Sequence, residues 1–522
     1  MKKNIFLIVL CWLALAGCGD FLEEESHELI YARTCADLEE LLIGNGYMKN
    51  GSNGKTLDRA SLSASKKEYY FPWIHVMDDD AEALIAGQEY EKCSFPILSS
   101  FYKWEKDPFN NQGAFFDDPV WAVLYEHIAV LNVILSKVEE FVNDTEEARN
   151  SVRGQCYFLR AAYYYLLVNF YAKPYEEATA ADDLGVPLKL TPVVEDKNFT
   201  RTSVDSVYNH IVSDLKLAVD CLKGIKMRSY NRANEDAARI LLSRVYCYMG
   251  KWELVPELCR EVLKKEYALK NLKAAVVGKD TWLDSRSPEV IFTQGSNVST
   301  AVFHGHYNNQ TLATFKISPE LEKLFDWKKE GENKNPDCRK DLLCYEEYGH
   351  LIPRKLTGSD TAFVDGMATY VSDCFLIRLP EVYLNLAEAL AMTNQDGEAR
   401  TVLKTFMDTR ISNLGTLTES GESLVKLIRD ERRRELCFEG HRWFDLRRYA
   451  VSPKYPEAKS ILHRMFEHNG GRAENDGAYV GYYQLPAYPD GGWVLPIPAY
   501  EIEATDGALI NNERENCLYY EY

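Results

Sequence analysis

The chain has 522 residues, of which 46% are hydrophobic and 27% charged, a balance typical of globular proteins large enough to bury a substantial core. Its formal net charge of −19 argues against a nucleic-acid backbone as its partner. Its Cys residues include no Cys-x-x-Cys pair and are scattered rather than regularly spaced, which disfavours both a zinc site and a disulfide framework.

Residues 1–17 have the three parts of a signal peptide: two Lys near the start, an apolar run over 5–16, and small residues before Cys18. The apolar run is well short of the ~20 residues that a transmembrane helix needs. Leu15-Ala16-Gly17-Cys18 resembles a bacterial lipobox, in which Cys18 becomes the lipidated first residue; the alternative is an ordinary secretory signal cut elsewhere. Acyl chains on Cys18 would form a durable membrane anchor. The acidic run over 19–25 is either a surface-export signal or a solvated tether.

Apolar residues then recur at helical spacing over several long segments. The pattern predicts one helix over Val120 to Val138 and a second over Thr145 to Tyr171, which Pro174 follows. A third helix is expected to end at Leu222, with Ser203 as its N-cap.

Two later segments have the pattern of helical hairpins. The first pairs helices over 237–249 and 254–263, and the second pairs helices over 379–392 and 398–409. Small residues on these helices permit close approach, and the pairs resemble tetratricopeptide units, which stack to bury their faces. Plain helical hairpins are the alternative. In both cases the sequence predicts a helical scaffold over about 119–265 and 373–450.

Two long stretches lack helical periodicity. Residues 45–118 and 266–372 are rich in Gly, Asn, Asp, Ser and aromatic residues and are too long to be simple connections. We expect variable ligand-binding loops there, because binding residues usually lie on loops held by a rigid frame. A short strand is expected within 287–292.

The densest charge lies over 421–449. Helical spacing predicts the ion pairs Asp430–Arg434, Glu431–Arg434 and Arg432–Glu435. Trp443 and Phe444 should pack beneath this network. His441 lies close to Asp445 in sequence, but no nucleophile accompanies them, so we expect no acid–base chemistry there.

Five motifs occur in one order along the chain. They are Trp121-x-x-x-Tyr125-x-x-Ile128-x-x-x-Asn132, Phe158-Leu159-Arg160-Ala161-Ala162-Tyr163-Tyr164-Tyr165, the segment from Ile377 to Ala389, the segment from Arg432 to Asp445, and Leu495-Pro496-Ile497-Pro498-x-x-Glu501-Ile502. With the lipobox and its acidic run, they resemble the SusD/RagB family of outer-membrane nutrient-binding lipoproteins, from residue 18 to about residue 522. The tail departs from the Gln-Asn-Pro-Gly-Tyr-like ending common in that family, since Ile510-Asn511-Asn512-Glu513 and Tyr519-Tyr520 stand there instead.

The resemblance implies a mostly α-helical fold: a single SusD-like domain over 18–522, with a tetratricopeptide-like hairpin scaffold, long irregular loops and a few short strands. It implies a lipid-anchored protein of the outer membrane, facing the cell exterior, that captures oligosaccharide without cleaving it. Its expected partner is a SusC-like TonB-dependent transporter, over which it acts as a lid; no cofactor and no nucleic acid are expected. The RagB side of the family implies peptide uptake as the alternative.

The family motifs are structural, so the ligand site has to be nominated from residue chemistry. Sugar faces stack on aromatic rings, and sugar hydroxyls need amide, carboxylate or imidazole partners. Two loop clusters combine these groups, one within 69–80 and one within 297–310. The candidate ligand-binding residues are Tyr70, Trp73, Asp79, Asn297, His304, Tyr307 and Asn309. Ordinary loop packing is the competing interpretation for each, and replacement of Trp73 or Tyr307 by Ala tests it: we expect weaker binding with little change in melting temperature.

Metal and catalytic sites have less support. Asp78 to Asp80 offer three carboxylates for calcium, but their spacing is not that of an EF-hand, and a solvated helix start is the favoured interpretation. His304-x-His306 lacks a third ligand, so no metal is predicted. A glycoside hydrolase would need two carboxylates that no motif singles out, and no His-Glu-x-x-His, Gly-x-Ser-x-Gly or Gly-rich phosphate loop occurs, so no catalytic residue is assigned.

Overall fold

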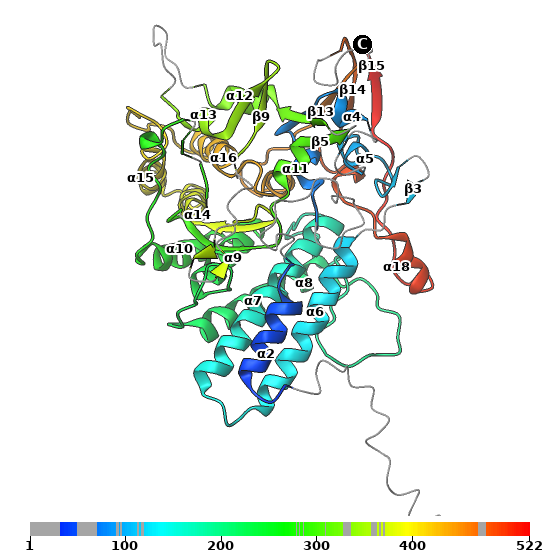
Figure 1. The fold of residues 1–522 in the computed structure, drawn as a ribbon, viewed down its shortest axis with the longest axis vertical. Helices are drawn as coiled ribbons and strands as arrows, with labels where there is room; N and C mark the ends of the chain where they lie inside the picture. Colours follow the sequence, from blue (N-terminus) through cyan, green and yellow to red (C-terminus); the bar gives the residue numbers. More distant parts are fainter. Residues whose placement is uncertain are drawn as a thin grey trace, which may run out of the picture.

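The fold is mostly helical, with several small sheets, as the sequence predicted (Figure 1). The computed structural model describes residues 32–49, 70–89, 93, 97–111, 114–115, 119–277, 279–280, 282–284, 287–307, 310–326, 336–355, 363–364, 367–368, 371–467 and 477–522. Every Cys within these ranges is a free thiol.

A block of long helices forms the lower end of the molecule in Figure 1. It comprises α2 (Cys35–Leu41), the π-helix η1 (Leu42–Gly46), α6 (Pro119–Lys137), the 3₁₀ turn η4 (Val138–Glu140), α7 (Glu146–Tyr171) and α8 (Val204–Leu222). The Thr145 and Ser203 side chains accept hydrogen bonds from backbone amides of the first turns of α7 and α8. The predicted beginnings of both helices are therefore confirmed.

The segment Val120–Glu140 within this block has the length and apolar composition of a membrane span, with a mean hydropathy of 1.3. Half of it, however, is buried inside the protein. Leu124, Ile128 and Leu131 are fully buried in the main core. Because a core helix of a globular protein passes the same test of length and composition, we interpret this segment as a core helix.

The two predicted helical hairpins are both present, and they pack against each other. They comprise α9 (Glu235–Tyr248), the 3₁₀ turn η5 (Trp252–Leu254), α10 (Val255–Leu263), α14 (Leu379–Met392) and α15 (Asp396–Met407). Helix α14 contacts α9, α10 and α15, although it is more than a hundred residues away from the first hairpin in sequence. Ala238 and Ala387 are fully buried, as expected for close helix approach.

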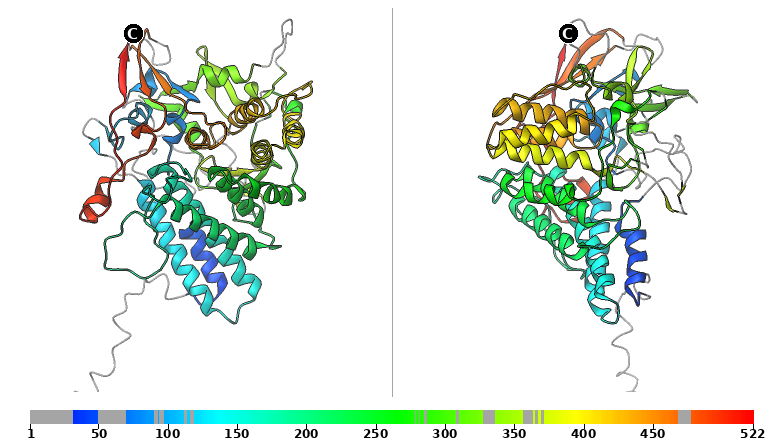
Figure 2. Two further views of the ribbon diagram at one scale, coloured as in Figure 1. Left: turned by 180° about the vertical axis from the view of Figure 1, so that it is seen from behind. Right: turned by 90° about the vertical axis from the view of Figure 1, so that its left-hand side faces the viewer.

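The predicted charged segment forms two helices, α16 (Glu422–Leu436) and α17 (Arg442–Ala450), which complete the scaffold (Figure 2). Of the three predicted ion pairs, Glu431–Arg434 is present at 2.6 Å. The other two are wrong: Asp430 pairs with Lys426, and Arg432 pairs with Asp445. Trp443 and Phe444 are buried beneath the helices, as predicted.

Glu435 shows why helical spacing misjudged this segment. Its carboxylate contacts Arg378, Arg410 and Arg339 at 2.5, 3.0 and 3.2 Å, and all four side chains are fully buried. These arginines come from other parts of the chain. The network is therefore a set of buried ion pairs between segments that are distant in sequence. Helical spacing predicts only the pairs that form along the surface of one helix.

The two loop stretches contain short helices and antiparallel strand pairs. The strand pairs are β1 (Ala81–Ala83) with β7 (Phe315–Ile317), β2 (Asn110–Asn111) with β3 (Ala114–Phe115), β4 (Val290–Gln294) with β12 (Phe375–Arg378), β5 (His304–Tyr307) with β6 (Gln310–Ala313), β8 (Cys344–Glu347) with β9 (His350–Pro353), and β10 (Phe363–Val364) with β11 (Met367–Ala368). The short helices are α3 (Ile74–Met77), α4 (Ile85–Gln88), α5 (Leu98–Tyr102), η6 (Leu272–Ala274), α11 (Ser299–Phe303), α12 (Pro319–Leu324) and α13 (Arg339–Leu343). The strand expected within 287–292 is β4, which begins three residues after the start of that range and ends two residues beyond it.

The C-terminal region forms a three-stranded sheet that the sequence analysis did not predict. It comprises β13 (Ile461–Phe466), β14 (Tyr479–Leu485) and β15 (Leu518–Glu521), in that spatial order, with β15 at the edge. The 3₁₀ turn η7 (Gly491–Trp493) and helix α18 (Ala499–Ala504) lie between β14 and β15 in sequence. This sheet lies at the end of the molecule opposite α2, next to the marked C-terminus in Figure 1.

Candidate functional site

Tyr70 and Trp73, the aromatic residues predicted to contact ligand in the first loop, lie in the hydrophobic core. Trp73 is 0% exposed; its ring stacks on Phe101 at a centroid distance of 4.7 Å and meets Phe170 edge-on at 4.8 Å. Tyr70 is buried as well, and its hydroxyl hydrogen-bonds to Nε2 of His127 at 2.9 Å. Both rings stabilise the core, so neither presents a face to a ligand. Replacement of Trp73 by Ala should therefore destabilise the fold, contrary to the expectation of little change in melting temperature.

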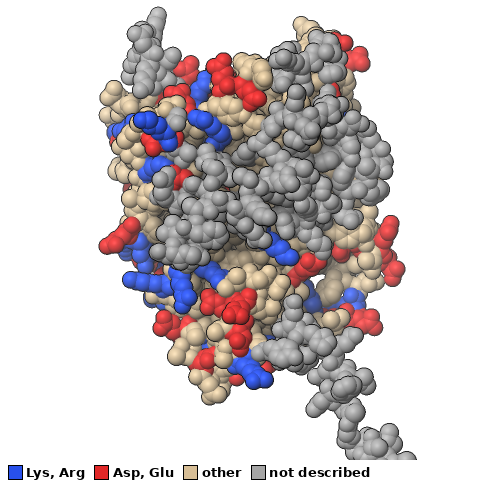
Figure 3. Space-filling view, in the orientation of Figure 1, with Lys and Arg blue, Asp and Glu red and all other residues tan. Residues whose placement is uncertain are grey.

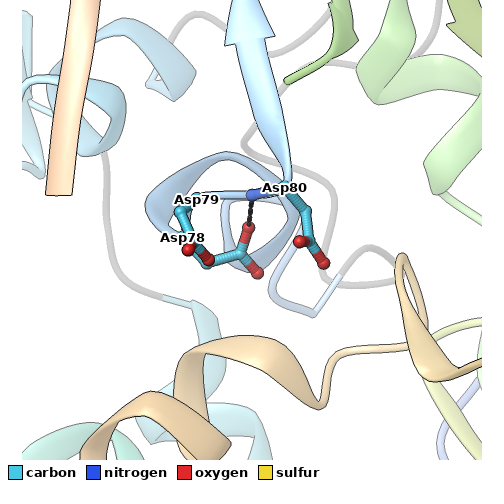
Figure 4. Close-up of side chains that lie close together, drawn as sticks. All are labelled: Asp78, Asp79 and Asp80. Carbon is cyan, nitrogen blue, oxygen red and sulfur yellow. Dashed lines mark hydrogen bonds between the residues drawn. The ribbon is translucent and has the colours of Figure 1, made fainter. Parts of the chain in front are cut away.

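Asp78, Asp79 and Asp80 lie in the turn between α3 and β1 (Figure 4). All three are buried, so the expectation of a solvated helix start is wrong. Asp79 accepts hydrogen bonds from Arg442 at 2.7 and 2.9 Å and contacts Lys459 at 2.5 Å. Arg433 donates to Asp80 at 2.7 Å. Cations from α16, α17 and the following segment thus already balance these carboxylates, and the cluster joins the first loop to the scaffold.

The pKa values of the three carboxyl groups are shifted in different directions. Burial, with the charges of Asp80 and Asp79, raises the pKa of Asp78 well above its ordinary value, and burial also raises the pKa of Asp80. Burial alone would also raise the pKa of Asp79, but Arg433 and Arg442 hold it well below its ordinary value. Figure 4 shows the Asp80 backbone N–H donating to Oδ1 of Asp78, at 2.9 Å. The cluster therefore has a structural role. The carboxylate of Asp79 is buried, so it is not exposed for the ligand binding that the sequence predicted.

Asn297 and His304, the predicted residues of the second loop, flank helix α11. Asn297 is buried, in a turn where the backbone amides of Val298 and Ser299 donate to Asp373 at 2.8 and 2.6 Å. His304 begins β5, and its imidazole lies parallel to the ring of Tyr345, with which it also hydrogen-bonds. Of these two residues, only His304 therefore belongs to a group that reaches the surface.

Tyr307 and Asn309 remain predictions. Tyr307 is the last residue of β5, opposite Gln310 in the β5–β6 hairpin, which places its backbone three residues beyond His304. Asn309 lies outside the described residues.

His304, Tyr345 and Glu347 form a polar and aromatic cluster, which we call the hairpin cluster. The Tyr345 hydroxyl donates to Glu347 at 2.8 Å, and Nε2 of His304 lies 3.8 Å from the same carboxylate. Tyr345 and Glu347 are partly exposed. An aromatic ring next to a carboxylate and an imidazole offers both the apolar face and the planar hydrogen-bonding groups that a sugar requires.

The sequence analysis missed Tyr345 and Glu347, although a local signal marks them. They alternate on β8, and the two residues between Glu347 and His350, Tyr348 and Gly349, both have positive φ, as a two-residue hairpin turn requires. Recognition of this hairpin would have placed Tyr345 and Glu347 on one face. Their contact with His304 could not be predicted from local sequence, because it joins two hairpins about forty residues apart in the chain.

A separate cavity of about 540 Å³ lies on the helical scaffold, between the segment after α7, the α9–α10 turn and the segment after α17. Tyr175, Tyr248, Trp252 and Arg448 are among its lining residues. Arg448 is already bound by Glu388 at 2.6 and 2.8 Å and by Asp445 at 2.7 Å. The Arg448 guanidinium in the wall of this cavity is thus already paired within the protein, and we take the hairpin cluster as the better candidate site.

A stack of helical hairpins that carries short strand hairpins at one end is a scaffold-and-loop architecture. Comparison with known families specifies the class. Residues 87–247 match a SusD-like family model described as starch-binding and associating with the outer membrane, and residues 274–514 match the SusD family model. The chain belongs to the SusD/RagB family, as its motifs indicated.

Similar proteins agree with this assignment. Two SusD-like proteins of Formosa agariphila, P25 and P2, are 26% and 25% identical to this chain over 271 residues. These matches cover 50% and 51% of this chain but only 46% and 47% of the relatives, so the similarity spans about half the length of each.

Solved structures share the fold over nearly the whole chain. A SusD superfamily protein from Bacteroides thetaiotaomicron is 21% identical, with a TM-score of 0.67 and coverage of 92% of this chain and 100% of its own. A putative sugar-binding protein from Bacteroides vulgatus is 22% identical, with a TM-score of 0.65 and coverage of 92% and 98%. A laminarin-binding SusD-like protein is 18% identical, with a TM-score of 0.59 and coverage of 92% and 99%. The predicted fold class is therefore confirmed.

Proposed function

We propose that this protein binds carbohydrate at the outer membrane without cleaving it and delivers the captured oligosaccharide to a SusC-like TonB-dependent transporter. The observation that carries the proposal is a SusD-superfamily fold over 92% of the chain, with the hairpin cluster on its loops. The names of similar proteins support it, since they include a sugar-binding and a laminarin-binding protein. The family model adds an association with the outer membrane.

The hairpin cluster supplies suitable chemistry for a neutral sugar. The Tyr345 ring offers an apolar face, while Glu347 and His304 are polar partners for hydroxyl groups. Tyr307, at the end of the strand that His304 begins, remains a proposed ligand contact, as does Asn309. Among the described residues on the face seen in Figure 3, Lys and Arg are interspersed with Asp and Glu.

Proteins of the SusD family are non-catalytic binding proteins, and we propose no reaction for this chain. The buried His441–Asp445 pair does not suggest one either. Burial, reinforced by the charges of Arg244 and Arg432, holds the pKa of His441 well below its ordinary value. The imidazole is therefore neutral at pH 7, and it is buried.

Isothermal titration of the mature protein against panels of oligosaccharides and peptides tests the proposal. We expect binding to a neutral oligosaccharide, and we expect Tyr345→Ala to weaken that binding at least tenfold because the stacking face is lost. Phe199→Ala is the matched control, since Phe199 is a partly exposed ring on the connection before α8. Binding of peptides alone would favour the RagB-like alternative and overturn the choice of ligand. Release of cleaved sugar would overturn the non-catalytic role.

Delivery to the transporter requires a separate test. We expect the protein to co-purify from detergent-solubilised membranes with a TonB-dependent β-barrel, and we expect its deletion to abolish uptake of the sugar that it binds. Normal uptake by the deletion strain would contradict the delivery role while leaving the binding role intact.

A further inference from the structure

The C-terminal sheet presents a face whose composition differs from that of an ordinary solvent-exposed sheet. Residues directly opposite each other on neighbouring antiparallel strands share a face. The pairing register therefore places two rows on one side of this sheet: Arg464, Tyr482 and Tyr520, and Leu462, Gln484 and Leu518. The opposite face includes Ile461 and His463, which are buried. The two rows therefore lie on the outward face, which we call the tyrosine platform.

The platform exposes a large apolar area. Leu462 is 55% exposed, Leu518 65% and Tyr520 39%. The rings of Tyr482 and Tyr520 stack on each other across β14 and β15, with centroids 5.1 Å apart and planes inclined by only 20°. Edge strands normally carry charged residues or Pro that prevent association, whereas β15 carries Leu, Tyr and Tyr before Glu521. A contiguous exposed patch of this kind marks a binding surface more often than a solvated one.

A glycine keeps β15 in place. A Cβ atom at Gly481 would lie 2.2 Å from the carbonyl oxygen of Tyr520 and 2.7 Å from the hydroxyl of Tyr519. Without that atom, the Tyr519 ring crosses β14 and its hydroxyl donates to the carbonyl of Val480 at 3.1 Å. The exposed tyrosines are therefore held in a defined arrangement by β14.

The charge on the platform is already neutralised within the protein. Arg464, its one cation, donates from Nε to Glu82 of β1 at 2.6 Å. What remains for a ligand are the two ring faces, the tyrosine hydroxyls and the Gln484 amide. Apolar faces combined with neutral hydrogen-bonding groups suit a neutral polyhydroxyl chain better than a charged polymer.

The platform and the hairpin cluster lie at the same end of the molecule, on either side of helix α4. The Gln88 side chain of α4 exchanges two hydrogen bonds with the backbone of Phe466 on β13, at 3.0 and 2.7 Å. On the other side, the carbonyl of Thr314, which directly follows β6, accepts a hydrogen bond from Leu84 just before α4. Figure 1 shows β5, α4, β13 and β15 together in the upper part of the molecule. A polymer that is bound at one of these sites therefore has the second site at the same end of the protein.

We propose that the tyrosine platform is a second carbohydrate-binding surface, which takes neutral polysaccharide along the Tyr482–Tyr520 pair while the hairpin cluster holds a shorter segment. This inference rests on the proposed function and extends it from one site to two. The platform adds affinity for long chains, because two linked contacts on one polymer reinforce each other.

Binding to long and short forms of the same sugar tests the platform. We expect the double variant Tyr482→Ala/Tyr520→Ala to lower retardation in polysaccharide affinity gels at least fivefold, while its Kd for a short oligosaccharide in titration calorimetry stays within twofold of wild type. Tyr482→Phe/Tyr520→Phe keeps the rings and should keep most of the polysaccharide binding. Tyr345→Ala should instead weaken the short oligosaccharide, and Phe199→Ala should change neither reading.

Each result distinguishes the platform from the main site. Unchanged polysaccharide binding by the double Ala variant overturns the platform alone, whereas absence of any carbohydrate binding by the wild-type protein overturns the proposed function as well. If the double variant binds polysaccharide normally but no longer co-purifies with the β-barrel, the face is a protein interface and the proposal is wrong. Should the double variant fail to fold, Tyr520→Ser alone replaces it, since this ring is exposed at the sheet edge, and the same two readings decide.

Discussion

Asp78 and Asp79 are adjacent in sequence and equally buried, yet their pKa values are shifted in opposite directions. Burial next to two other acids raises the pKa of Asp78, whereas contacts with Arg433, Arg442 and Lys459 lower the pKa of Asp79. Both differ from the solvated turn that their sequence suggests. The distinction follows from which side chains of α16 and α17 reach each carboxylate.

We expect Asp79→Asn to lower the free energy of unfolding by about 3 kcal/mol at neutral pH, because it leaves buried cations without their partner. The folded pKa of Asp79 is depressed, so its contribution is complete above the unfolded value of about 4 and is lost as the pH falls through the folded value. The deficit of the variant should therefore shrink below about pH 4. Urea unfolding at several pH values measures it.

Asp78→Asn is the matched variant and should behave in the opposite way. Because the folded pKa of Asp78 is raised, wild-type stability falls as the pH rises from about 4 towards the folded value. Asn cannot ionise, and its amide oxygen can still accept the bond from Asp80. The variant should match wild type near pH 4 and be more stable at pH 7; a loss of stability at pH 7 would show that Asp78 is ionised.

Trp73→Ala should lower the free energy of unfolding by about 3 to 5 kcal/mol, the usual cost of deleting a buried Trp side chain. The ring is 0% exposed and packs between Phe101 and Phe170, so the substitution leaves a cavity. Thermal melts measure the loss, with the highly exposed Val194→Ala as control. Normal stability together with weakened sugar binding would contradict this core role and show that Trp73 contacts the ligand.

Candidate site residues were hard to predict because aromatic and polar residues in a loop look alike whether they bind ligand or fill the core. Trp73 and Tyr345 illustrate this ambiguity: the first lies in the core and the second reaches the surface. Only long-range packing separates them, since Trp73 is covered by α5 and α7 while Tyr345 lies on a hairpin over His304.

At the scale of elements, sequence alone defined the helices well because their signals are local. Thr145 and Ser203 cap α7 and α8 through hydrogen bonds that span three residues. The C-terminal sheet was not predicted, since β14 pairs with β15 across more than thirty residues. Its tyrosines point to both faces of the sheet, so the strands lack the alternation of apolar and polar residues that marks a strand in a sequence. The buried network on α16 was predicted only in part for the same reason: Glu435 finds its partners at Arg339, Arg378 and Arg410.

We expect Glu435→Gln to lower the free energy of unfolding by about 3 to 5 kcal/mol, because it removes the charge that three fully buried arginines share. Asp430→Asn on the same helix is the matched control. Among the residues that the structure describes, Asp430 pairs with the exposed Lys426, so its loss should cost no more than about 0.5 kcal/mol. Chemical denaturation of both variants compares the two pairs, and similar costs would contradict the structural role of the buried network.

At the scale of the whole molecule, the two ends have different tasks in the proposed function. The amino end of α2 is fixed at the α6–α7 turn, where the Cys35 backbone N–H donates to Asp144 at 2.5 Å. This is the lower end in Figure 1, while the hairpin cluster and the tyrosine platform belong to the upper end. The amino end of α2, to which the proposed tether would connect, thus lies at the end of the molecule opposite both proposed sugar surfaces.

Lipidation of Cys18 is the proposed attachment of that tether. We expect Cys18→Ser to move the protein from the membrane fraction to the soluble fraction, with its melting temperature and oligosaccharide Kd unchanged, because residue 18 precedes every element of the described fold. Sugar uptake by cells should fall, since a free binding protein no longer stays beside the transporter. Replacing Glu23, Glu24 and Glu25 by Gln is the matched control: the protein should stay in the membrane fraction, and loss of its accessibility to external protease would identify the acidic run as an export signal rather than a solvated tether. Retention of the Cys18→Ser variant in the membrane would contradict the lipid anchor and require attachment through the partner or through another segment.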